Sequence, residues 1–302
     1  MPKVWWFNEQ VALMSSRSAC FRRARAGILW SAAALTIAAA AMAATASDAV
    51  VPPALSADQI AQRNLDARGG GDAWHRVNAL GLRGTMEIPP PPLGPRQVIV
   101  EQAQAADGRR HQTLAPPKAL HVPFLMALRR PHQMRLEIQF RNQVAAQVFD
   151  GKQGWLVSGA PGQWTAQPLA PDQANAAAEQ EDLDGPLIDY AAKGTRIELE
   201  AVEPIDGRSA FRLKLQTASG IERHLWIDCQ SFLDVKIDGL LQINGKVRLV
   251  SIYFRDYQPA DGLMIARTIE TRPDGLDESQ ITHIDTVAVN PAVDEATFRR
   301  PR

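Results

Sequence analysis

Apolar and polar side chains alternate along most of the chain from about residue 78 onwards. The alternation is unbroken over residues 134–140 and 210–216, where Phe211, Leu213 and Leu215 share one face. A period of two predicts antiparallel strands with one apolar face and one polar face. The same pattern predicts further strands at 143–149, 153–158, 196–203, 221–228, 232–240, 246–257, 263–272 and 279–289.

Two-residue turn signals separate these strands. Asp-Gly, Asn-Gly or Ser-Gly pairs occupy positions 150–151, 206–207, 219–220, 244–245, 261–262 and 274–275. Asp-Gly and Asn-Gly pairs accept the positive φ angles of tight hairpins. Strands and turns spaced in this way form a long meander. The pattern therefore predicts a mainly β fold, either a barrel or a strongly curved sheet.

Two regions are predicted to be helical. Ser56 and Gln59 form a capping box that begins a helix over 56–68, which the glycines at 69–71 end. Residues 171–183 are rich in alanine and acidic side chains, and residues 186–192 follow as a second short helix. We expect the helices near 56–68 and 171–192 to cover the concave apolar face of the sheet as a lid. Because alanines bury little area, the cover near 171–192 is expected to be held less tightly than the sheet.

The N-terminal segment has the three parts of a secretory signal. Arginines at 17, 22, 23 and 25 precede an apolar stretch rich in alanine, which closes on Ala-Thr-Ala at 44–46. We therefore expect residues 1–46 to be a signal peptide, 47–55 a linker and 56–302 a single domain in the periplasm. An uncleaved membrane anchor is the alternative. Translation from Met14 instead of Met1 would give a more ordinary signal, and both starts stay open.

This export hypothesis predicts the N-terminus of the mature protein. Signal peptidase cleaves after a small-residue A-x-A pattern, so protein recovered from the periplasm is expected to begin at Ser47 or within a few residues of it. N-terminal sequencing of that fraction measures it. An intact N-terminus in the membrane fraction would support the anchor instead.

The composition of the mature chain excludes some partners. The signal holds five of the 33 basic residues and one of the 33 acidic residues, which leaves 256 residues with a net charge of about −4. This charge does not favour nucleic acid or an anionic membrane surface. Cys229 is the sole cysteine after residue 46, so no disulfide within the mature chain is expected.

The sequence carries no positive sign of catalysis. Its histidines, at 75, 111, 121, 132, 224 and 283, form no pair with metal-ligand spacing, and no Gly-x-Ser-x-Gly motif is present. We therefore predict no catalytic residues, no metal and no cofactor. The acidic run at 179–184 is interpreted as a solvent-exposed helix face. Arg129 and Arg130 are interpreted as charges at a strand end, although a phosphate site is the alternative.

Five segments together resemble a known family. They are Arg-Pro-His-Gln-Met-Arg-Leu-Glu at 130–137, Phe-Asp-Gly-Lys-Gln-Gly-Trp at 149–155, Leu-Asp-Gly-Pro-Leu-Ile-Asp-Tyr at 183–190, and the segments 256–263 and 289–298. In their order and spacing they resemble the outer-membrane lipoprotein-sorting protein (LolA/LolB-like) superfamily over about residues 56–300. The resemblance implies an unclosed antiparallel β-barrel with an α-helical lid, whose hydrophobic cavity holds lipid chains in the periplasm.

The apolar strand positions and the resemblance together define a candidate ligand cavity and its lid. The cavity is predicted to be lined by Met134, Leu136, Ile138, Phe140, Phe211, Leu213, Leu215, Leu225 and Ile227, with Leu183, Leu187, Ile188 and Tyr190 in the lid. A filled core without a cavity is the alternative from the pattern alone. The favoured function is a non-enzymatic periplasmic carrier of lipoprotein acyl chains or another lipid, with transient contacts to membrane proteins. A sensor of lipid or mislocalised lipoprotein and a lipid- or sugar-modifying enzyme are the alternatives.

Overall fold

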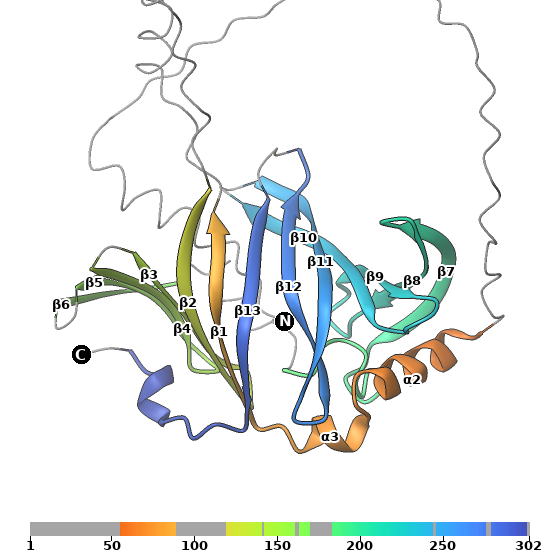
Figure 1. Ribbon diagram of the computed structural model, residues 1–302, viewed down its shortest axis with the longest axis horizontal. Helices are drawn as coiled ribbons and strands as arrows, with labels where there is room; N and C mark the ends of the chain where they lie inside the picture. Colours follow the sequence, from red (N-terminus) through yellow and green to blue (C-terminus); the bar gives the residue numbers. More distant parts are fainter. Residues whose placement is uncertain are drawn as a thin grey trace, which may run out of the picture.

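A single antiparallel sheet of 13 strands dominates the computed structural model, which describes residues 55–88, 119–140, 142–160, 163–169, 183–243, 246–275 and 279–300. Its strand order is β6-β5-β4-β3-β2-β1-β13-β12-β11-β10-β9-β8-β7. The edge strands β6 and β7 do not pair with each other, so the curved sheet stays open (Figure 1). The prediction of a mainly β, unclosed barrel is confirmed.

The strands have the following bounds: β1 Ala79–Ile88, β2 Leu120–Arg129, β3 Gln133–Phe140, β4 Gln143–Phe149, β5 Gly154–Ala160, β6 Gln163–Pro168, β7 Arg196–Ile205, β8 Arg208–Gln216, β9 Glu222–Asp228, β10 Asp234–Ile243, β11 Lys246–Ala260, β12 Leu263–Pro273 and β13 Gln280–Val289. The helices are α2 Ala57–Ala67, α3 Gly71–His75 and the 3₁₀ helix η2 Glu295–Phe298.

The order of the strands leaves one connection between the two edge strands. From β1 in the middle, the chain adds β2 to β6 outwards on one side. It then resumes at β7, on the opposite edge, and returns strand by strand to β13, which pairs with β1. The chain between Leu169 and Arg196 therefore joins the two free edges.

The predicted strands are present, and three strands were missed. β4 has the predicted bounds, whereas β1, β2 and β6 were not predicted as separate strands. In β2 residues 124–128 are all apolar, so the sequence lacks the alternation that predicted the other strands, although burial alternates in the folded sheet. The structure accommodates Pro123 because pairing between β2 and β3 begins only at Phe124.

The hairpin turns adopt the backbone that their sequences favour. Asp206 and Gly207 have φ angles of 48° and 80°, and Asp261 and Gly262 have 46° and 82°. Positive φ at both central residues is the type I′ arrangement, whose twist matches that of the flanking strands. The turn predicted at 244–245 lies outside the described residues.

Helix α2 confirms the prediction for residues 56–68. The Ser56 side chain accepts from the Gln59 amide and the Gln59 side chain accepts from the Ser56 amide, so the capping box is complete. Ile60, Ala61 and Asn64 are buried on one face. At the far end Gly69 has a φ of 113°, and a Cβ there would collide with the Gly262 carbonyl oxygen.

Within the described ranges no helix is long and apolar enough to cross a membrane.

Residues 183–195 form consecutive turns, and the helix predicted at 186–192 is wrong. Gly185, Asp189 and Gly194 have φ angles of 85°, 53° and 73°. Because an α-helix needs negative φ at every residue, three left-handed positions in ten residues prevent it. The helix predicted at 171–183 lies, up to residue 182, outside the described residues. Conversely, the short helix α3, which buries Trp74, was not predicted.

Candidate functional site

The two faces of the sheet differ as the alternation predicted. On β3, Met134, Leu136 and Ile138 are buried to 4%, 1% and 1% exposure on the concave face. Between them, Arg135 and Glu137 lie on the opposite face and form an ion pair, with 2.6 Å between Arg135 Nη2 and Glu137 Oε2. The predicted orientation of this strand is confirmed.

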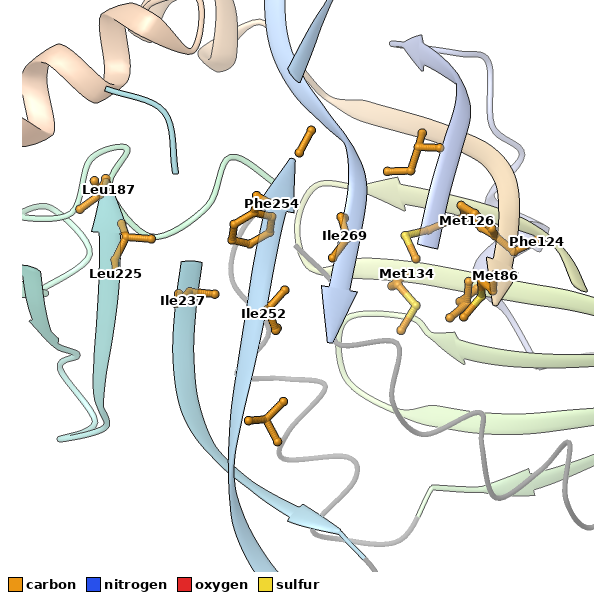
Figure 2. Packing of buried hydrophobic residues seen from close by; sticks show 14 of the residues in the cluster. Met86, Phe124, Met126, Met134, Leu187, Leu225, Ile237, Ile252, Phe254 and Ile269 are labelled. Carbon is orange, nitrogen blue, oxygen red and sulfur yellow. The ribbon is translucent and has the colours of Figure 1, made fainter. Parts of the chain in front are cut away.

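All nine predicted cavity residues belong to one apolar cluster, which we call the inner cluster. Phe140 is partly buried at its margin and the other eight are buried. The cluster also contains side chains from β1, β2, β10, β11 and β12, so it is continuous across both halves of the sheet (Figure 2). Sequence reasoning missed these neighbours: Met86, Phe124, Met126, Ile237, Ile252, Phe254 and Ile269. Alternation was the available signal for Met86, Ile237 and Ile269. A ligand-binding role for the cluster stays a prediction.

Residues 183–195, which we call the cover segment, bury apolar side chains against the sheet. Leu187 is 4% exposed and belongs to the inner cluster (Figure 2). Ile188 is 1% exposed and packs in a second cluster with Trp74 of α3 and Leu263 of β12. The other two predicted lid residues, Leu183 and Tyr190, are partly buried beside these clusters. One short segment therefore contacts both apolar clusters.

A buried carboxylate anchors the cover segment to the sheet. Asp184 is only 2% exposed, and its two oxygens lie 2.7 Å from Arg130 Nη2 and 3.0 Å from Lys193 Nζ. Arg130 also donates to the Val77 carbonyl oxygen. The interpretation of Asp184 as part of a solvent-exposed acidic face is therefore wrong. It is wrong because Arg130 is 54 residues away in sequence and local pattern does not reveal such a partner.

The charge of Asp184 is stabilised by these contacts. Burial raises the pKa of this carboxyl, but hydrogen bonds from Arg130 and Lys193 outweigh burial, so its pKa lies below the ordinary value of 3.8. Two further contacts hold the same segment at the surface: His75 with Asp189 at 2.7 Å, and the Tyr190 hydroxyl donating to Asp58 of α2. These contacts tie residues 183–190 to the rest of the protein, and a looser hold of the cover than of the sheet stays a prediction.

Two polar side chains on the concave face have buried atoms without partners. Within the described part of the chain, neither Nε nor Nη1 of Arg267 has a hydrogen-bond partner, and neither does the side-chain amide of Gln280. Gln280 is 1% exposed. Buried polar groups are normally paired, because an unmade hydrogen bond in a dry interior costs free energy. Arg267 and Gln280 are therefore unusual among the buried polar side chains of this face, which also include Thr271 and Thr282.

Two hollows lie elsewhere on the sheet. One, of about 380 Å³, opens where β10 and β11 stop pairing, and Phe254, Arg255 and Tyr257 are among its lining residues. Burial raises the pKa of the Tyr257 hydroxyl, which has no partner among the described residues. The other, of about 530 Å³, lies over the outer face of β1, β2 and β3, beside the ion pair of Arg135 and Glu137. Neither is formed mainly by the predicted cavity residues.

Comparison with known proteins gives similarity only to solved structures. No family model and no curated protein matches the chain. A LolA superfamily protein from Nitrosomonas europaea is 12% identical, with a TM-score of 0.49 over 82% of this chain and 99% of that one. An outer membrane lipoprotein-sorting protein domain from Vibrio parahaemolyticus is 13% identical, with a TM-score of 0.47. The similarity covers 79% of this chain and 94% of that one.

A third structure, of a DUF1329 family protein from Desulfovibrio piger, is 10% identical, with a TM-score of 0.49 over 80% of this chain and 97% of that one. Two of the three structures are thus described in terms of lipoprotein sorting or the LolA superfamily.

Proposed function

We propose that this protein is a periplasmic carrier that holds lipid or lipoprotein acyl chains against the inner cluster, without catalysis. The observation that supports it is the inner cluster itself, a continuous apolar surface on the concave face of a sheet whose edges β6 and β7 stay unpaired. An open sheet of this kind can part from its cover without breaking strand pairing. The cover segment, which immediately precedes the edge strand β7, is the element that has to move.

The energetics of acyl-chain transfer favour this function. Moving a chain from water to an apolar surface contributes about 0.8 kcal/mol per buried methylene, so a sixteen-carbon chain gains on the order of 12 kcal/mol before costs. Apolar contacts are not directional, so a bound chain replaces the contacts that Leu187 loses when the cover lifts. Loading and release then differ mainly in whether a chain or the cover occupies the inner cluster.

Binding of an acyl chain tests the proposal directly. Delipidated protein is expected to bind a fluorescent fatty-acyl probe saturably, and native mass spectrometry of protein from the periplasm is expected to show bound lipid. Replacing Met134 of the inner cluster by Gln keeps the side-chain length but places an amide on the apolar face. Because an unsatisfied amide costs at least about 1 kcal/mol, the probe should bind roughly fivefold more weakly.

The matched control lies on the other face. Leu125 of the neighbouring strand β2 is 46% exposed, so Leu125→Gln is expected to leave probe binding unchanged. An equal loss of probe affinity in both variants would indicate that the acyl chain does not bind at the inner cluster. Absence of saturable binding by the parent protein, together with absence of co-purified lipid, would refute the carrier function.

A further inference from the structure

Arg267 is a cation on the concave face of the sheet without an anion. Its Nε and Nη1 atoms are buried and unpartnered, and among the described residues no ion pair reaches its guanidinium. Two other partly buried arginines are neutralised: Arg255 contacts Glu270 at 2.8 Å, and Arg130 contacts Asp184 at 2.7 Å. Among the described arginines, Arg267 is the one with two buried nitrogen atoms that lack a hydrogen-bond partner.

The register of the strands places Arg267 on the concave face. On β12 it alternates with Ile265 and Ile269, which are 3% and 9% exposed. Ile269 is paired with Thr282, and Thr282 with Met86, a fully buried member of the inner cluster. Because strand residues two apart share a face, Arg267 stands on the face of Ile269, and its neighbour Ala266, which is 0% exposed, also belongs to the inner cluster.

A carboxylate lies close in register but does not neutralise Arg267. On β11 the pairs of Arg255 with Thr268 and Tyr257 with Ala266 place Asp256 opposite Arg267. Asp256, however, has a φ of 56°, in the left-handed region, and its side chain is exposed. The two residues form no ion pair. The local backbone of β11 therefore leaves the guanidinium without its nearest candidate partner.

We propose that Arg267 binds the anionic head group, a carboxylate or phosphate, of the lipid whose chain occupies the inner cluster. This inference rests on the proposed carrier function and specifies its ligand class. A buried charge costs free energy unless it is paired, and a guanidinium offers a planar fork that matches both anions. With the apolar side chains of Met86 and Ile269 on the same face, the acyl chain and the head group have separate partners.

The head group can be tested separately from the chain. Palmitate and hexadecanol, which share a sixteen-carbon chain, compete with the fluorescent acyl probe for delipidated mature protein. The parent is expected to bind palmitate about tenfold more tightly, since a hydrogen bond to a charged group contributes at least this much. Arg267→Met is expected to reduce the preference to less than twofold, and Arg267→Lys to restore part of it. Acetate and inorganic phosphate, which lack a chain, are expected not to displace the probe.

The controls separate a ligand role from a structural one. Arg83→Met removes an exposed arginine and should leave the preference for palmitate unchanged. The melting temperature of empty Arg267→Met should equal or exceed that of the parent, because an unpaired buried charge is removed. A clear decrease would indicate that Arg267 is structural.

Equal binding of palmitate and hexadecanol by the parent overturns the proposal and leaves the carrier function intact. Failure of both to bind refutes the carrier function itself. Displacement by phosphate would identify a free-anion site instead.

Discussion

Replacing Leu187 and Ile188 together by Asp is expected to accelerate release of a bound acyl probe at least tenfold while the sheet stays folded. Both side chains are almost fully buried, one in each apolar cluster. Charged groups there would be desolvated at a cost of several kcal/mol, so the cover segment is expected to lift instead. The dissociation rate of the probe and the far-ultraviolet circular dichroism of the β-sheet measure the two effects.

The same segment supplies a matched control. Ala191 and Ala192 are exposed, so introducing the same two charges there is expected to change neither release nor stability. If the double variant at 187 and 188 releases the probe as slowly as the parent, the cover is only packing and does not gate the ligand. If instead the β-sheet signal is lost cooperatively, the segment belongs to the folding core.

Asp184→Asn is expected to destabilise the folded protein by about 3 kcal/mol, because breaking a buried ion pair leaves uncompensated charge. The estimate takes the lower end of the usual range, since the side chains of Arg130 and Lys193 are 29% and 27% exposed and partly hydrated. Urea denaturation measures the loss. Asp189→Asn, at a half-exposed pair with His75, is the control and should cost less than about 1 kcal/mol. Equal losses in the two variants would contradict an anchoring role for Asp184.

The same ion pair predicts a dependence on pH. The pKa of Asp184 is lower in the folded protein than its ordinary value of 3.8, so its contribution to stability is fully present above that value. The contribution is lost as the pH falls below 3.8 through the folded pKa. The difference in unfolding free energy between the parent and Asp184→Asn should therefore shrink at acidic pH. A difference that stays constant down to pH of about 2 would exclude Asp184 as its source.

Local patterns in the sequence were sufficient for the strands and for the faces of the sheet. In β3 the alternation assigned Met134, Leu136 and Ile138 to the buried face, because side chains two apart on a strand always share a face. Helix α2 was predictable for a similar reason, since its capping box joins residues only three apart. The cover segment shows the limit of such patterns: its composition favoured helix, but left-handed residues break it into turns.

Patterns along the chain were thus enough to predict a mainly β protein with a continuous apolar face and a candidate set of ligand-contacting residues. Tertiary structure decided which groups meet across that face. It paired β1 with β13, buried Asp184 against Arg130, and left Arg267 without a counter-charge. Periodicity reports on neighbours along the chain, whereas these contacts depend on the order and register of distant strands. A one-residue change of register would move Arg267 to the other face, and for this reason only the folded sheet reveals its unpaired charge.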